Sequence, residues 1–460
     1  MTISEEYASY INHLRFETLP DEVVAKTKQL ILDSIGCAIA GTSSDTRQVL
    51  SKYIPYYEAE RGCSVFSFNR RYSPDVAMLS NGVMSHSYDF DDCHNASLTH
   101  PASILVACLL SLGELSKFSG RDAIAAFVGG YEIAVRLGMA ATPLGQYTRG
   151  FHPTGTVGTL GAAALCGKVM GLDVEQLTNA LGVAGSCASG LMEWTADGAM
   201  TKRLHSGLAA RSGFLAASLA KHGFTGPKTV IEGKQGFLNA FGSVIVFDKL
   251  TLGLGKTYET LDSQIKLYAC NSGFHTSIEA LLRILNEHKI AAEDIEAVSA
   301  GIRTGTKLTT ASDENYHSPK TILDCQMSLP FTLAVAAFDR KVSVEQYTEE
   351  KMRDKRIQEL TVRIETPVKQ YLVDAYEKDH RVLASDVEVK TKSGQKFTLR
   401  IDYPRGGPGN TGEPKEVEDK FLSLTEPKIG SDSAHQLSEV VHNLESTDDV
   451  RKLWSIIKFK

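Results

Sequence analysis

Helical periodicity is the dominant pattern of this chain up to about residue 265. In the stretch DEVVAKTKQLILDSIGCAIAG at 21–41, apolar and small side chains recur every three or four residues, acids stand at the start and Gly41 stands at the end. That combination predicts an amphipathic helix. Further helices are predicted at 104–115, 122–139, 157–170, 174–185 and 209–222. Small residues are abundant in them, so we expect closely packed helices.

Strand-like patterns begin only after residue 290. The segments AVSAGIR (297–303) and LTVRIET (360–366) are predicted to be strands. The segment VEVKTKSGQKFTLRI (387–401) alternates on both sides of a Ser-Gly pair, as a β-hairpin does. A helix is predicted just before them, at 276–287. This region therefore has the pattern of an α+β domain.

Helical patterns return near the end of the sequence. They occupy 417–424, 433–444 and 450–457. A chain of 460 residues exceeds the size at which one hydrophobic core stops growing. We therefore expect a mainly α fold with two domains: a large all-helical domain formed by 1–268 and completed by 403–460, and a smaller α+β domain at 269–402.

The composition narrows the possible partners and the location. A net charge of −6 offers no basic excess for phosphates, so nucleic-acid binding is not expected. The N-terminus MTISEEYASYINHL has no targeting pattern. The longest uncharged stretch, 176–192, is too weakly apolar to span a bilayer. The 8 cysteines include no CxxC pair, which indicates reduced thiols. We expect a cytoplasmic protein without a membrane partner.

Ionisable residues gather in five short segments that also contain glycine, proline or serine. These segments are YDFDDCHNASLTHPAS (88–103), RGFHPTGTVG (149–158), MTKRLHSGLAAR (200–211), KLYACNSGFH (266–275) and NYHSPKT (315–321). Backbones bend at such residues, so side chains from separate segments can converge. A pocket built from them holds several positive charges that face a few aspartates.

The first segment admits three interpretations: a metal site, a proton-transfer site or solvated acids at a helix start. Carboxylates favour Mg²⁺ or Mn²⁺. However, Asp89 and Asp91 share one face of an extended segment while Asp92 points away, and no His-x-His or HExxH spacing is present. Acids at a helix start are favoured by the helix dipole. No metal is expected here, and the other two interpretations remain open.

Two lysines and two histidines stand out by their neighbours. Lys202 precedes His205 by three residues, and Lys266 precedes the turn-like ACNSG. A buried lysine beside an aspartate can bind a carboxylate, although most lysines are exposed. His100 and His152 each precede a proline, which displays the imidazole from an extended residue at a predicted helix start. Two histidines in the same context favour proton transfer over purely structural hydrogen bonding.

These segments, in this order, resemble the MmgE/PrpD family. The resemblance runs from LILDSIGCAIAGT (30–42) through NGVMSHSYDFDDCH, HPTGTVGTLGAAA, MTKRLHSGLAAR and KLYAC to SPKTILDCQMSLPFTLAVA (318–336). It implies a helical main domain, a smaller α+β lid, a homodimer, and chemistry on a small polycarboxylate that needs neither metal nor cofactor.

The resemblance also implies which residues form the site. The implied catalytic residues are His100, Asp89, His152, Lys202 and His275, and the implied substrate-binding residues are Lys266, Cys93, Arg203 and Cys270. Family members share proton transfer at a carbon next to a carboxylate. The favoured expectation is cis-aconitate decarboxylation to itaconate and CO₂, and the alternative is 2-methylcitrate dehydration. An epimerase of the iminodisuccinate type and a non-catalytic polycarboxylate-binding relative are less favoured.

Overall fold

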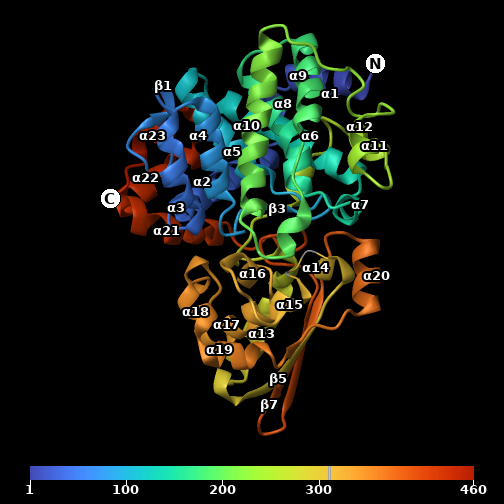
Figure 1. Cartoon of the computed structure of the whole chain (residues 1–460), viewed down its shortest axis with the longest axis vertical. Helices are drawn as coiled ribbons and strands as arrows, with labels where there is room; N and C mark the ends of the chain where they lie inside the picture. The colour runs from blue at the N-terminus through green and yellow to red at the C-terminus, as the bar shows by residue number, and fades with distance from the viewer. Residues whose placement is uncertain (309, 311) are drawn as a thin grey trace.

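The computed structural model describes residues 1–308, 310 and 312–460. The chain is 60% helix and 9% strand, so the expectation of a mainly α fold is confirmed. A large helical part lies above a smaller α+β part in Figure 1. The helices of the large part that precede the α+β part are α1 (Ile3–His13), α2 (Asp21–Gly41), α3 (Asp45–Tyr53), α4 (Pro74–Ser85), α5 (Pro101–Leu115), α6 (Gly120–Ala140), α7 (Pro143–Thr148), α8 (Pro153–Val169), α9 (Val174–Cys187), α10 (Thr201–Lys221), α11 (Phe237–Phe241) and α12 (Asp248–Thr251).

The predicted helices are present, and those predicted at 104–115, 157–170 and 209–222 begin earlier than expected, at Pro101, Pro153 and Thr201. Helices α5 and α8 each start with a proline, and the N-cap residues just before them, His100 and His152, have non-helical backbone angles. Proline suits the first helical position because its fixed φ fits the helix and its missing N–H is not needed there. Both imidazoles therefore project from helix starts.

Small residues let the central helices approach closely. A Cβ atom added to Gly82 on α4 would lie 2.8 Å from Cα of Gly207 on α10, and one added to Gly161 on α8 would lie 2.6 Å from the carbonyl oxygen of Gly130 on α6. The first contact brings the end of α4 next to the start of α10, where Lys202 lies. Helix α6 is long and apolar enough to cross a membrane, but its apolar window is 100% buried inside the protein.

The large part is not all-helical, which corrects the sequence prediction. Strands β1 (Glu58–Ser64) and β2 (Arg71–Tyr72) form one antiparallel pair, and β3 (Cys93–His94) and β4 (Ser263–Gln264) form another. Three of these strands have only two residues each, too short to show an alternating pattern. The β3–β4 pair matters for function, because it holds the segment after Asp89 against the segment before Lys266.

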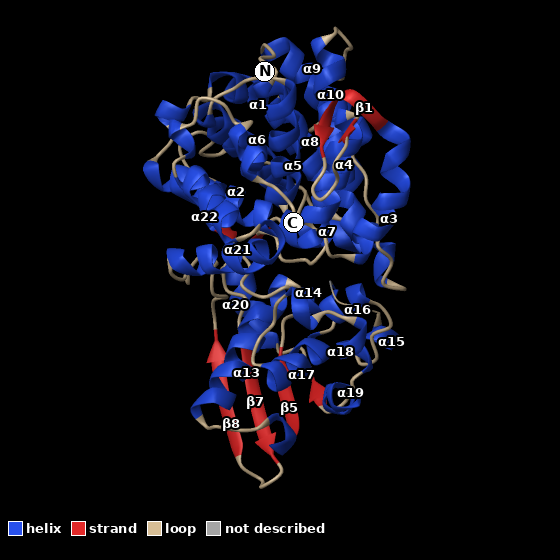
Figure 2. Cartoon of the chain, turned by 90° about the vertical axis from the view of Figure 1, so that its left-hand side faces the viewer, coloured by secondary structure: helices blue, strands red, loops and turns tan. Residues whose placement is uncertain are grey.

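The α+β part is built on a four-stranded sheet with the order β6-β5-β7-β8. Strand β5 (Ile295–Gly301) is parallel to β6 (Ile364–Glu365) and antiparallel to β7 (Ser385–Thr391), which forms the predicted hairpin with β8 (Lys396–Ile401). Figure 2 shows helices packed beside this sheet. The helices are α13 (His275–Glu287), α14 (Thr304–Leu308), α15 (Asp313–Tyr316), α16 (Ile322–Gln326), α17 (Leu329–Asp339), α18 (Glu349–Arg353), α19 (Lys355–Thr361) and α20 (Gln370–Lys378).

The predicted strand at 360–366 is mostly wrong. Its first residues end helix α19, and only Ile364–Glu365 is strand. Asp354 caps α19 by accepting a hydrogen bond from the N–H of Arg356, and Ile357 and Leu360 bury one helical face. The N-cap and this three-residue spacing favour a helix, and they outweigh the short alternating pattern that predicted a strand.

The chain then returns to the large part, as the red helices beside the blue ones show in Figure 1. Helices α21 (Pro414–Ile429), α22 (Ser431–His442) and α23 (Lys452–Ile456) share one hydrophobic core with α2 and α5. Lys420 on α21 reaches Asp33 on α2 at 2.5 Å and donates to the carbonyl oxygen of Phe90 at 2.6 Å. The C-terminal helices thereby anchor the segment next to Asp89. The boundaries at 268/269 and 402/403 stay predictions.

Candidate active site

A small cavity of about 30 Å³ lies where the two parts of the chain meet. The large part lines it with Asp89, Cys93, Leu98, His100, Tyr147, His152, Met192, Trp194, Lys202 and Lys266, and the α+β part lines it with Asn271, Ser272, Arg303 and Met327. The cavity wall is rich in cations and imidazoles.

Asp89 is the centre of the charged wall. Its Oδ1 atom accepts hydrogen bonds from Nζ of Lys202 and Nζ of Lys266, each at 2.9 Å, and Lys266 also donates to its carbonyl oxygen at 2.9 Å. The residue has φ +51°, a left-handed conformation that aspartate tolerates better than most residues. All three side chains are buried, so two ammonium groups share one carboxylate away from bulk water.

Burial and charge act against each other in this trio. Burial disfavours the charged form of Asp89, but Lys202 and Lys266 outweigh it and hold its pKa well below the usual range. Burial also opposes the charge of Lys266, but Asp89 and Asp91 outweigh it and raise its pKa. At Lys202, burial dominates and lowers the pKa of the ammonium group. Lys202 is therefore the more easily deprotonated of the two lysines.

His86 links Lys202 to a second carboxylate. Its Nδ1 atom lies 2.8 Å from Oδ2 of Asp91, and its Nε2 atom accepts a hydrogen bond from Nζ of Lys202 at 3.1 Å. Because the Asp91 carboxylate is an acceptor, Nδ1 carries the hydrogen and Nε2 is free to accept. Asp91, His86 and Lys202 thus form a buried chain behind the cavity wall.

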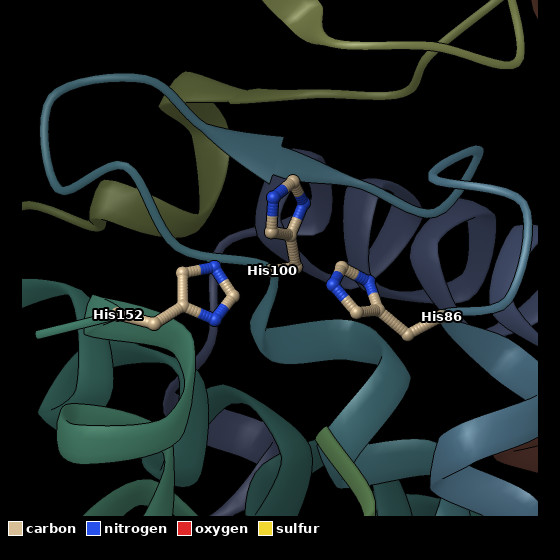
Figure 3. Close-up of side chains that lie close together, drawn as sticks. All are labelled: His86, His100 and His152. Atoms are coloured by element: carbon tan, nitrogen blue, oxygen red, sulfur yellow. The ribbon is translucent and has the colours of Figure 1, made fainter. Parts of the chain in front are cut away.

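His100 presents its other ring nitrogen to the cavity. Its Nδ1 atom donates to the carbonyl oxygen of Asp92 at 2.5 Å, and its Nε2 atom lies 4.0 Å from Oδ1 of Asp89. Burial, followed by the charge of Lys266, lowers the pKa of His100 to about 3. At neutral pH the imidazole is therefore uncharged, with an unprotonated Nε2. Figure 3 shows His86, His100 and His152 gathered around one space.

Asp92 has a structural role. Its Oδ1 atom accepts from the N–H of Ala102 in the first turn of α5, and its Oδ2 atom accepts from the hydroxyl of Tyr131 at 2.9 Å. Burial and then Asp91 raise its pKa well above the usual range. Asp92 therefore fits the interpretation of the DFDD segment as acids at a helix start. It is buried, however, rather than solvated. Asp89 lies in the cavity wall.

Three of these histidines lie close enough together to suggest a metal site, so their surroundings show whether a metal ion fits there. Ring nitrogens of His86, His100 and His152 lie within 4.8 Å of one another. However, Asp91 and Lys202 occupy both nitrogens of His86, and the oxygen of Asp89 nearest to them binds two ammonium groups. A cation placed here would face Lys202 and Lys266. These surroundings suit an anion better than a metal ion.

Two family models cover most of the chain. The MmgE/PrpD N-terminal domain matches residues 5–246, and the MmgE/PrpD C-terminal domain matches residues 268–446. The chain belongs to the MmgE/PrpD family. The match confirms the resemblance seen in the sequence. The second matched region continues through α21 and α22, although these helices pack against α2 of the large part.

Relatives in this family align over their whole length. A cis-aconitate decarboxylase-like protein, oryM, of Aspergillus oryzae is 28% identical over 99% of this chain and 97% of its own. The human cis-aconitate decarboxylase is 27% identical over 99% of this chain and 95% of its own. The cis-aconitate decarboxylase of Aspergillus terreus is 25% identical over 99% and 96%. These similarities indicate an enzyme of the lyase kind.

Six of the nine predicted site residues line the cavity of this MmgE/PrpD chain. They are Asp89, Cys93, His100, His152, Lys202 and Lys266. The thiol of Cys93 donates to Oδ1 of Asn95 at 3.3 Å and to Oγ of Ser272 at 3.6 Å, and burial raises its pKa to about 11. Cys93 therefore acts as a neutral polar group in the wall rather than as a nucleophile.

The other three predicted residues, Arg203, Cys270 and His275, do not line the cavity, and their predicted roles stay predictions. Arg203 follows Lys202 on α10, so helical geometry turns it away, and it pairs with Asp45 instead. Cys270 lies in the apolar core of the α+β part, where burial raises the pKa of its thiol. His275 starts α13, and its Nδ1 accepts from the amide of Gln264 at 3.2 Å.

The structure adds residues that the sequence analysis did not select. Trp194, Tyr147 and Arg303 line the cavity, and His86 and His205 support lining residues from behind. His86 lies two residues before the acidic segment, so its position next to the acids was a usable signal. Arg303 and Trp194 come from segments whose patterns do not distinguish them from surface residues.

Proposed function

We propose that this protein is a metal-independent lyase that decarboxylates cis-aconitate to itaconate and CO₂. The observation that carries the proposal is the shared carboxylate of Asp89, which holds Lys202 and Lys266 in the cavity wall beside the uncharged imidazole of His100. Lys202, Lys266 and Arg303 outnumber the carboxylates of Asp89 and Asp91 by one positive charge, which attracts a polycarboxylate. The names of the relatives support cis-aconitate as the substrate.

The proposed reaction needs a bound carboxylate and one proton. The bond between the methylene carbon of cis-aconitate and its carboxylate breaks, and CO₂ leaves. The electron pair spreads over the allylic carbons and makes the new terminal double bond. The carbon that carried the vinyl hydrogen then takes a proton, which gives itaconate. Positive groups fixed in a buried cavity stabilise the negative charge that develops on the carbon atoms of the substrate.

His100 is the proposed proton donor. Its Nε2 is unprotonated at neutral pH, because burial lowers the pKa of His100 to about 3. A bound tricarboxylate brings negative charge next to this nitrogen, and a nearby negative charge raises the pKa of an imidazole. Substrate binding thereby favours uptake of the proton that the reaction consumes. Lys202 and Lys266 hold the remaining carboxylates, and Asp89 keeps both lysines in place.

Proton NMR of the EDTA-treated protein with separate samples of cis-aconitate, 2-methylcitrate and citrate tests the proposal. We expect itaconate from cis-aconitate. A Lys202→Met variant, which keeps the apolar stem and removes the charge, serves as the matched control and is expected to form none. Formation of 2-methylaconitate from 2-methylcitrate without itaconate contradicts the decarboxylase and supports a hydro-lyase that uses the same cavity.

A homodimer in the cytoplasm is also part of the proposal, on the strength of the family resemblance. The chain has a mass of 50.1 kDa. Light scattering behind size-exclusion chromatography is expected to give about twice that mass. A monomeric mass at micromolar concentration contradicts the dimer.

A further inference from the structure

Arg303 has a buried guanidinium group with no carboxylate partner among the residues that the structure describes. The residue is 5% exposed and lines the cavity from the α+β part. Its Nε and Nη1 atoms are buried and make no hydrogen bond to any described residue. No aspartate or glutamate of the described residues forms an ion pair with it, and positions 309 and 311 are Thr and Ala. A buried charge without a partner is unfavourable, so this group is built to receive an anion.

The surroundings fix the position of the guanidinium. Ile302, just before it, pairs with Val368 beside the central strand β5. The Cζ atom of Arg303 lies 4.0 Å from the ring centre of Tyr376 on α20. The hydroxyl of Tyr376 in turn donates to the carbonyl oxygen of Asn95, in the large part, at 3.5 Å. Stacking of this kind holds the guanidinium face and leaves its N–H edge available for a planar acceptor.

The charges of the cavity differ on its two sides. Lys202 and Lys266 belong to the large part and already share the carboxylate of Asp89. Arg303 belongs to the α+β part and contributes a positive charge that Asp89 does not balance. A ligand that satisfies both sides carries one carboxylate near the lysines and a second one near Arg303.

We infer that Arg303 binds a carboxylate of the substrate and makes the enzyme select molecules with two or more carboxylates. The inference rests on the proposed function for the identity of the substrate. The bound carboxylate accepts two parallel hydrogen bonds from the guanidinium edge, a geometry that lysine cannot reproduce. The substrate then connects the two parts of the chain, because one end lies at the lysines and the other at Arg303.

Calorimetric titration with propane-1,2,3-tricarboxylate tests this role apart from turnover, because that compound has no double bond to react. The wild type is expected to bind it, and Arg303→Gln is expected to bind it about 10- to 100-fold more weakly, the usual loss for a hydrogen bond to a charged group. Arg47 provides the control: its Cζ lies 4.5 Å from the ring centre of Phe68, and it is not part of the cavity wall. Arg47→Gln is expected to bind like the wild type.

The outcomes separate this inference from the proposed function. Equal affinities of the wild type and Arg303→Gln overturn the role of Arg303, whether or not itaconate forms. A wild type that neither binds the tricarboxylate nor converts cis-aconitate overturns the proposed function and the inference with it. Where Arg303→Gln fails to fold, Arg303→Lys decides: it keeps the charge but loses the planar edge, and an affinity equal to that of the wild type overturns the paired hydrogen bonds.

Discussion

The Nδ1 atoms of His152 and His205 lie 3.0 Å apart. One of them must donate and the other accept, so the two rings cannot both carry a hydrogen on Nδ1. Burial, and then the charge of His205, lowers the pKa of His152 well below its usual range. Burial, and then the charge of His86, lowers the pKa of His205 to about 4. The tautomer of His152 is therefore coupled to the tautomer of His205.

Replacement of His205 is expected to reduce turnover through His152. His205→Leu removes the partner of Nδ1, and we expect kcat to fall at least about 10-fold, as for other residues that orient a reacting group. His205→Asn places an amide near the position of Nδ1 and should retain more activity. Steady-state kinetics of both variants, with the exposed His13→Leu as control, measures the effect. Equal rates for the Leu and Asn variants would contradict the orienting role.

His86 is predicted to position Lys202. His86→Asn keeps a group near Asp91 but loses the acceptor for Lys202, whereas His86→Gln can still accept from the ammonium group. We expect kcat to fall about 10- to 100-fold in the Asn variant and to recover partly in the Gln variant. A purely structural role would instead lower the melting temperature of both variants without this order of rates.

Asp89→Asn is expected to destabilise the protein as well as inactivate it. Asparagine tolerates the same left-handed backbone, so the substitution removes charge with little added strain. Two buried ammonium groups then lose their shared counter-ion, which costs about 3–5 kcal/mol of unfolding free energy. Urea denaturation measures this change. Asp75→Asn, in the exposed pair with Arg211, is the control and is expected to change stability by less than about 1 kcal/mol.

Acid is predicted to destabilise the folded protein between about pH 6.5 and pH 4. Burial lowers the pKa of seven histidines: His86, His94, His100, His152, His205, His275 and His380. Below pH 6.5 the unfolded chain takes up protons that the folded histidines refuse, so the stability they confer is present above that pH and is lost as the pH falls.

Four acidic residues have the opposite effect on stability, because burial raises the pKa of their carboxyl groups, so that they favour the folded state as the pH falls. They are Asp33, Asp92, Glu259 and Asp262. The histidines outnumber them, and each histidine contributes up to about 1.4 kcal/mol per pH unit. Chemical denaturation at pH 7, 6 and 5 is expected to show falling stability, with a smaller slope in His205→Asn. Stability that rises toward pH 5 would refute this account.

Metal removal is predicted to leave turnover unchanged. The nitrogens of His86 are occupied by Asp91 and Lys202, and two ammonium groups lie on Asp89, so a cation gains little in this cavity. The measurement is itaconate formation before and after dialysis against EDTA, with metal content determined by mass spectrometry. Activity that disappears on dialysis and returns with Mg²⁺ or Zn²⁺ would show that the lysines move to admit a metal.

The sequence predicted the fold better than it predicted the site wall. Helices such as 21–41 were found because their apolar spacing is local, and the proline after His100 and the one after His152 marked where two helices start. The helix at Lys355–Thr361 was missed because a short alternation beyond it resembled a strand. Two-residue strands such as β3 exist only through pairing with a distant segment, which no local pattern records.

For the site, the segments that resemble the family bring six of the nine predicted residues to one cavity, but not the other three. Lys202 and Arg203 are neighbours in sequence, and only the orientation of α10 turns one toward the cavity and the other toward Asp45. The sequence analysis did not select Arg303, because what marks this residue is that its buried guanidinium has no partner among the described residues. Such a property appears only in the folded chain. Packing between elements that are distant in sequence therefore determines which of the predicted residues line the same cavity.

The contact of Lys420 with Asp33 and with the carbonyl oxygen of Phe90 has a consequence for the biosynthesis of this protein. Asp89 is synthesised more than three hundred residues before the lysine that anchors its neighbour. While the ribosome is still making the α+β part, the segment around Asp89 has left the exit tunnel without α21 to hold it. The nascent chain can form early helices, but it completes the cavity only after the C-terminal helices emerge.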